Sequence, residues 1–216
     1  MATDISTHDY KQGGSEAKTL YESAMGYLKS KEIEYNGKKM LLPGDEKAAA
    51  VLLDDIVKKF DPRSDTYAAK AMYVLASLHE SNVHPNASVD EAIRLYKIVA
   101  STSQGANAKL SLGLMYLEGW KTDHNPEEGM ALVNDSLAEL EKNGMVDPWY
   151  YERLGGIYCD AKDTKARAKN YQAMQKAVFY FEKAVKISLS IEDQARLESA
   201  RDGLDRARKW CDVLKK

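Results

Sequence analysis

The side chains best suited to metal binding or acid–base catalysis are few and lie far apart in this chain. They are His8, His79, His84, His124, Cys159 and Cys211. His84 and His124 both fall in predicted loops between helices, where stacked repeats could make them neighbours. No carboxylate or thiol stands at a spacing diagnostic of a metal site, and no nucleophile can be paired with a base. We therefore expect no metal ion, no cofactor and no catalytic activity.

Several smaller patterns have structural interpretations. Gly155-Gly156 lies inside a predicted helix, so it is not expected to form a phosphate-binding loop. Asn86-Ala87-Ser88 fits a glycosylation sequon but is better explained as the cap of the following helix. Both cysteines lie in helical patterns and are expected to be free thiols, with a disulfide as the alternative. His79 is expected to be a core residue with a hydrogen bond.

Composition places the chain among ordinary water-soluble proteins. Of 216 residues, 44% are hydrophobic and 30% are charged, and 31 basic against 33 acidic residues give a net charge of −2. This balance lacks the basic footprint of sequence-independent nucleic-acid binding. No apolar run is long enough to span a membrane, and residues 1–14 form a polar, flexible tail without the features of a secretory signal. The cytoplasm is therefore the expected compartment, with neither nucleic acid nor membrane as a partner.

The elements that must position any site are predicted to be helices throughout. Capping residues, prolines and helical spacing of apolar residues set their limits. Ser88-x-x-Glu91, Asn125-Pro126 and Asp147-Pro148 are the clearest start signals, and Ser190-x-x-Asp193 is expected to open the last helix. Residues 31–44 are predicted to be a loop with Asn36-Gly37 and Pro43-Gly44 as breakers. No strand pattern competes, so we predict an all-α fold. The expected helices span about 15–30, 45–60, 65–81, 88–104, 106–118, 125–143, 147–161, 171–189 and 190–214.

A pattern of small and large residues repeats along these helices. It is complete in Ala108-x-x-x-Leu112-Gly113-x-x-Tyr116-x-x-Gly119 and returns in part around Leu75 and Leu154, which gives spacings of 37 and 42 residues. A period in this range is typical of solenoids of helical hairpins. A small residue on the second helix of each pair is expected to pack against a small residue on the first helix. A large residue, four positions after the small residue of the second helix, is expected to fill the space between successive hairpins. The small residues are 76, 113 and 155 with partners Ala92, Gly129 and Ala177, and the large ones are Tyr96, Val133 and Phe181.

In these residues the chain resembles the Sel-one-like repeat family, which is related to the tetratricopeptide repeats. The resemblance covers roughly residues 65–187. It implies a right-handed α-solenoid. Together with the predicted helices, this gives one solenoid domain over 15–216, with hairpins at about 15–60, 65–104, 106–143 and 148–189 and a capping helix at 191–214. It also implies binding of a protein or peptide, without catalysis.

The same resemblance implies that the first helix of each pair lines a concave, partner-binding face. The residues placed on this face are Lys70, Tyr73, Ser77, Asn107, Leu110, Leu114, Leu117, Trp149 and Glu152. Leu110, Leu114 and Leu117 form a second apolar stripe, which is either covered by neighbouring helices or exposed as a groove for an apolar segment. Trp149 is either packed locally or an interface anchor.

Two further segments leave alternatives open. The last helix carries a heptad stripe that either packs as a cap on the final hairpin or forms a homodimer seam. The stripe consists of Leu197, Ala200, Leu204, Ala207, Cys211 and Leu214. The basic segment 162–169 is either a solvated loop or a docking site for an acidic partner.

The sequence thus predicts a non-catalytic adaptor that binds a partner protein or peptide in a concave groove. A structural homodimer through the last helix is one alternative, and an inhibitor or immunity-type protein that blocks an enzyme is another. The identity of the partner does not follow from these residues.

Overall fold

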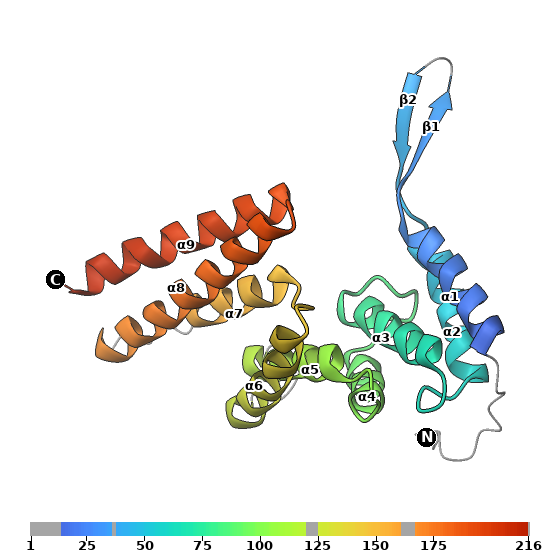
Figure 1. Ribbon diagram of the computed structural model, residues 1–216, viewed down its shortest axis with the longest axis horizontal. Helices are drawn as coiled ribbons and strands as arrows, with labels where there is room; N and C mark the ends of the chain where they lie inside the picture. The colour runs from blue at the N-terminus through green and yellow to red at the C-terminus, as the bar shows by residue number, and fades with distance from the viewer. Residues whose placement is uncertain (1–13, 36–37, 120–124, 161–166, 216) are drawn as a thin grey trace. The chain divides into compact units, whose positions relative to one another are not determined.

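The structure, a computed structural model, describes residues 14–35, 38–119, 125–160 and 167–215 (Figure 1). Within these ranges it contains nine α-helices and one two-stranded hairpin, which confirms the predicted helical class. The chain divides into two compact units, Met1–Leu112 and Gly113–Lys216, and each is described by itself. The single solenoid domain over 15–216 stays a prediction. The tail 1–13, His124 and positions 162–166 of the basic segment lie outside the described residues.

The first unit is built from antiparallel helices that pack on their sequence neighbours. Three helices of this unit begin at capping residues, whose side-chain oxygens accept hydrogen bonds from backbone N–H groups of the first turn. These residues are Asp45 for α2, Asp65 for α3 and Ser88 for α4. Such caps satisfy N–H groups that the first helical turn leaves without partners. The predicted start at Ser88 is therefore confirmed. The helices are α1 (Gly14–Leu28), α2 (Glu46–Lys59), α3 (Thr66–Glu80), α4 (Val89–Ala100) and the beginning of α5 (Ala106–Glu118).

The segment predicted as a loop between α1 and α2 instead forms a β-hairpin. Strands β1 (Lys31–Tyr35) and β2 (Lys38–Leu42) pair antiparallel, with Lys31 opposite Leu42 and Tyr35 opposite Lys38. The hairpin extends away from the ends of α1 and α2 (Figure 1). Two residues, Asn36-Gly37, separate the paired ends, and this dipeptide is the strongest short hairpin signal. The loop prediction was wrong because it treated Asn36-Gly37 as a breaker alone.

The second unit holds the rest of α5 and four further helices, α6 (Pro126–Lys142), α7 (Pro148–Asp160), α8 (Arg167–Ser190) and α9 (Gln194–Lys215). Asn125 caps α6 with Pro126 in the first turn, as predicted. Gly144, with φ +65°, follows the end of α6 in the left-handed conformation that glycine adopts readily after a helix. The prediction for α9 needs correction: Ser190 still belongs to α8, and Asp193 caps α9 by accepting the Arg196 N–H at 3.0 Å.

Close helix approach in the second unit depends on small residues, as the repeat pattern predicts. A Cβ added to Gly113 on α5 would lie 2.8 Å from the carbonyl oxygen of Gly129 on α6, and the reverse distance is also 2.8 Å. On α7, a Cβ on Gly155 would lie 2.7 Å from the Phe181 ring, which also packs on Gly203 of α9. The helices can approach this closely because these positions carry no side chain.

The heptad stripe of α9 is covered within the second unit. Leu197, Ala200, Leu204, Ala207 and Cys211 are buried, and Leu214, the last residue of the stripe, is partly buried. Leu204 and Ala207 join Ala177 and Phe181 of α8 in one apolar cluster. Five of the six stripe residues are therefore already removed from water, which disfavours this stripe as the seam of a homodimer; the homodimer itself stays a prediction.

Two other expectations can be compared with the described residues. Cys159 and Cys211 are free thiols, as favoured from the sequence; Cys211 is buried and Cys159 is partly buried. Among the described residues, no helix combines the length and the apolar character needed to cross a bilayer.

Candidate functional site

Three predicted contact residues lie on α3 in the first unit. Lys70 and Ser77 are exposed, and Tyr73 is partly buried. The Lys70 ammonium lies 5.2 Å from the centroid of the Tyr67 ring, and the Tyr73 ring lies 5.7 Å from that of Tyr96. Their spacing places the three predicted residues on one face of α3. Their role in binding stays a prediction.

The leucine stripe of α5 is mostly covered, which excludes the exposed groove that was one of its two interpretations. Leu110 and Leu114 are fully buried, whereas Asn107 and Leu117 are partly buried. From residue 108 to residue 116 only Lys109 is not buried, because this stretch is apolar or small around its whole circumference. Leu110 and Leu114 are therefore core residues rather than contact residues.

Trp149 and Glu152 are brought together in one cavity of the second unit. This cavity, called here the Trp149 cleft, has a volume of about 650 Å³ and lies between α7 and the start of α9. It is lined by Trp149, Glu152, Arg153, Asp193, Ala195, Arg196 and Ser199. Two of the predicted contact residues thus share a surface with five others, of which only Asp193 was singled out from the sequence, as part of the start signal of the last helix.

The start of α7 positions the first wall of the cleft. Asp147 Oδ1 accepts the Trp149 N–H at 2.8 Å, which caps the helix at Asp147-Pro148 as predicted. Trp149, Glu152 and Arg153 follow at helical spacing, so their side chains share one face of α7. The Trp149 side chain remains 37% exposed.

The Trp149 ring is oriented by two neighbours. The Arg153 guanidinium lies 5.0 Å from the ring centroid, and the Tyr150 ring meets it edge-on at 5.1 Å. Arg153 is itself anchored by two hydrogen bonds to the Glu118 carboxylate, from Nε at 2.5 Å and from Nη2 at 2.7 Å. This bidentate pair is largely buried, with 13% and 18% of the two side chains exposed. The Trp149 ring is therefore exposed but held in one orientation.

Glu152 supplies the most unusual polar atom of the cleft. Ser199 Oγ donates a hydrogen bond to Glu152 Oε2 at 2.5 Å. The other carboxylate oxygen, Oε1, is buried and accepts no hydrogen bond from any described residue. Burying an acceptor without a donor is unfavourable, by about 1–3 kcal/mol for a typical polar group. Arg196 Nη1 faces this oxygen from 4.0 Å, which is beyond hydrogen-bond distance, so the acceptor is left unsatisfied.

The Arg196 guanidinium lies near three carboxylates but forms a close ion pair with none of them. Its guanidinium nitrogens lie 3.5 Å from Asp147, 3.6 Å from Asp193 and 4.0 Å from Glu152. Charge-assisted N–H···O bonds are normally 2.7–2.9 Å long, so these contacts are loose ion pairs. One cation thus faces three carboxylates, which leaves this side of the cleft acidic.

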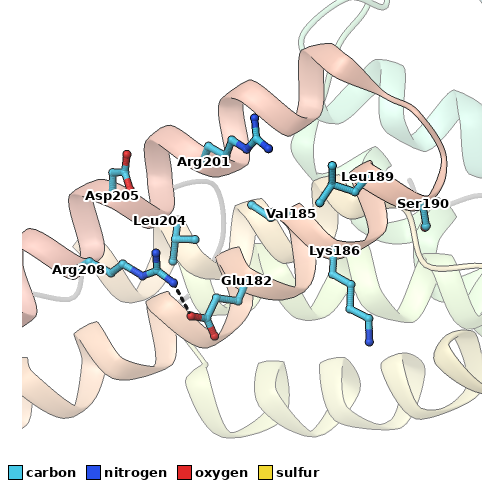
Figure 2. Close-up of a pocket in the computed structure, with 9 residues that line it drawn as sticks. All are labelled: Glu182, Val185, Lys186, Leu189, Ser190, Arg201, Leu204, Asp205 and Arg208. Carbon is cyan, nitrogen blue, oxygen red and sulfur yellow. Dashed lines mark hydrogen bonds and ion pairs between the residues drawn. The ribbon is translucent and has the colours of Figure 1, made fainter.

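A second groove runs between α8 and α9 and contains none of the predicted contact residues (Figure 2). Its volume is about 790 Å³. Val185, Leu189 and Leu204 provide its apolar surface, and an ion pair between Glu182 and Arg208, at 2.9 Å, bridges the two helices. Lys186, Arg201 and Asp205 also line the groove and are drawn without a partner in Figure 2, but none of the described polar atoms that line it is both buried and without a hydrogen bond.

The two described histidines of the first unit form a structural pair. His79 and His84 are buried and stacked at 4.0 Å, and His84 Nε2 lies 3.2 Å from Asp54 Oδ2. His79 Nδ1 accepts the Ser88 N–H at 3.2 Å, which confirms the prediction of a hydrogen-bonded core residue. Burial and the neighbouring His84 lower the pKa of His79. Among the described residues, no three or more His, Cys, Asp or Glu side chains are grouped to hold a metal ion.

The second wall of the Trp149 cleft could not be found from the sequence. Asp193, Arg196 and Ser199 lie more than 40 residues after Trp149 and look like ordinary polar positions of an amphipathic helix. Only the packing of α9 on α7 and α8 brings them to the cleft. The one available signal was the cap at Asp193, which fixes where α9 begins.

Comparison with known proteins adds no identification: no protein-family model matches the chain, and no curated protein matches it significantly. The resemblance to Sel-one-like repeats therefore depends on the repeated small and large residues themselves.

Proposed function

We propose that this chain is a non-catalytic protein-interaction module made of helical-hairpin repeats, and that it binds a partner polypeptide at the Trp149 cleft. The observation that carries the proposal is the exposed, oriented Trp149 ring beside the largely buried carboxylate of Glu152. An aromatic anchor next to a fixed polar group is typical of the energetic centre of an interface.

The size of the anchor is sufficient to matter. A tryptophan side chain can bury about 150–250 Å². Removing the exposed 37% of Trp149 from water would contribute about 2 kcal/mol at 25 cal/mol per Å². Because Arg153, Glu118 and Tyr150 already fix the ring, little side-chain entropy remains to be lost on binding.

The repeat architecture supports the same class of function. The Gly113–Gly129 approach, the burial of Ala76 with Ala92, and the packing of Phe181 against Gly155 agree with one hairpin pattern used three times. Stacked hairpins of this kind form extended surfaces suited to polypeptide partners. The free thiols and the near-neutral charge support a cytoplasmic protein partner rather than nucleic acid.

The two alternatives differ in how well the contacts support them. A homodimer through the α9 stripe would need residues that are buried in the unit. An inhibitor of a partner enzyme would use the same kind of cleft, so it is a special case of the interaction module.

Affinity capture with the full chain tests the proposal. Wild type, Trp149→Ala and Phe179→Ala are immobilised side by side, and bound proteins are identified by mass spectrometry. Phe179 is a matched control because its ring is 51% exposed in the same unit but does not line the cleft. We expect a partner that wild type and Phe179→Ala retain and Trp149→Ala loses. Equal capture by all three proteins would contradict a role for the cleft.

A further inference from the structure

We propose that the Trp149 cleft receives a basic side chain, lysine or arginine, presented by the partner polypeptide. This inference rests on the proposed function and names the chemistry that the cleft recognises. It is drawn from the hydrogen bonds, charges and ring contacts around Glu152, Trp149 and Arg196.

The unmet acceptor gives the first argument. Glu152 Oε1 is buried, while its partner oxygen already accepts the Ser199 hydroxyl. A lysine ammonium or an arginine guanidinium brings several N–H donors and the opposite charge. Such a group would satisfy the oxygen with a charge-assisted hydrogen bond, which is stronger than a neutral one.

The charge around the cleft gives the second argument. Asp147, Glu152 and Asp193 surround Arg196, and only one positive charge balances these three negative charges. The other cation of the cleft, Arg153, is neutralised by Glu118. An incoming cation would therefore be attracted, whereas an incoming carboxylate would meet an acidic surface.

The aromatic wall gives the third argument. The faces of a tryptophan ring attract cations, and Arg153 already makes this contact at 5.0 Å. Trp149 is still 37% exposed, so part of the ring is accessible to a ligand. A basic side chain could lay its aliphatic stem on the exposed ring while its charged end reaches Glu152.

Nuclear magnetic resonance of the full ¹⁵N-labelled chain tests the inference. The indole N–H signal of Trp149 is identified by its loss in Trp149→Phe. The probes are four peptides, acetyl-Gly-Gly-X-Gly-Gly-amide, in which X is arginine, lysine, glutamine or glutamate. We expect the arginine and lysine peptides to shift the Trp149 signal and the glutamine and glutamate peptides to leave it in place. Glu152→Gln keeps an acceptor for Ser199 but removes the charge, and it should abolish the shift.

Arg196 provides a test of sign. Arg196→Ala removes the internal cation that competes with the ligand, so the arginine peptide should bind about twofold to fivefold more tightly. Arg201→Ala is the matched control, because it removes the same charge from an exposed site on α9 that does not line the cleft. Its effect should be much smaller.

Three results would overturn the inference: no shift with either basic peptide, an equal shift with the glutamate peptide, or weaker binding to Arg196→Ala. These results are distinct from failure of the proposed function. A Trp149-dependent partner in the capture experiment, together with any of the three, would retain the interaction module and reject basic-side-chain recognition. If the capture experiment gave no Trp149-dependent partner and the basic peptides gave no shift, both the proposed function and the basic-side-chain inference would be rejected.

Discussion

Replacing Gly113 with alanine should destabilise the second unit, although alanine is the better helix former. Gly113 and Gly129 face each other where α5 crosses α6, and each would place a new Cβ 2.8 Å from the other's carbonyl oxygen. This is about 0.6 Å short of the 3.4 Å at which ordinary contact begins. The obstacle is backbone, so the two helices must separate.

The magnitude follows from two opposing terms. Overpacking a close contact costs about 1–3 kcal/mol. Changing glycine to alanine in a helix returns about 0.4–1 kcal/mol by restricting the unfolded chain. The net expectation is a loss of about 1–2 kcal/mol of unfolding free energy.

Gly156→Ala is the matched control for this prediction. Gly156 also lies in a helix of the second unit, but a Cβ there would meet no described atom within 4 Å. It should stabilise the unit by about 0.4–1 kcal/mol. All three tryptophans follow residue 112, so urea unfolding followed by tryptophan fluorescence reports on this unit. If Gly113→Ala stabilised the protein as much as Gly156→Ala, the close approach of α5 and α6 would be refuted.

Three further predictions can be checked on the same protein. Gly203→Ala should cost about 1–3 kcal/mol in the same urea assay, because its Cβ would lie 2.2 Å from the Phe181 ring; an unchanged midpoint would contradict this packing. Arg153→Lys should cost about 1 kcal/mol and alter tryptophan emission, because lysine cannot form the bidentate pair with Glu118 or stack flat on Trp149; unchanged emission would argue against that orientation. Burial, then the charge of His84, holds the pKa of His79 below 6.5, so the folded state favours the neutral ring. The free energy of unfolding that the neutral His79 ring contributes is fully present above pH 6.5, and it is lost as the pH falls through the lowered pKa of the folded state. Thermal melts by circular dichroism should show this slope, and His79→Asn, which cannot titrate, should reduce it.

Local signals in the sequence predicted local structure well. The caps at Ser88, Asn125 and Asp147 depend on side chains within a few residues of the N–H groups they accept, so the sequence alone locates them. The close approach at Gly113 was also predictable, because the repeat places small residues opposite one another. The hairpin of β1 and β2 was not predicted, because Asn36-Gly37 was interpreted only as a breaker between helices and the residues of β2 show no clear alternation of apolar and polar side chains.

Long-range features were predictable only in part. The exposure of Leu110 and Leu114 depends on how many neighbours surround α5, which spacing within one helix does not specify. Trp149 and Glu152 were identified from their place on a first helix, but Arg196 and Ser199 depend on the register of α9 against α7. That register is set by Phe181 between Gly155 and Gly203, a contact among three residues far apart in the chain.

Site-specific photo-crosslinking tests the central claim most directly. A benzophenone amino acid replaces Ala195, an exposed residue that lines the Trp149 cleft, and in a parallel protein it replaces Ala138, an exposed residue of α6 outside the cleft. Irradiation in native lysate should give a covalent adduct with a partner protein from position 195 and none from position 138, and Trp149→Ala should abolish it. Adducts of equal yield from both positions, or an adduct that survives Trp149→Ala, would contradict the account.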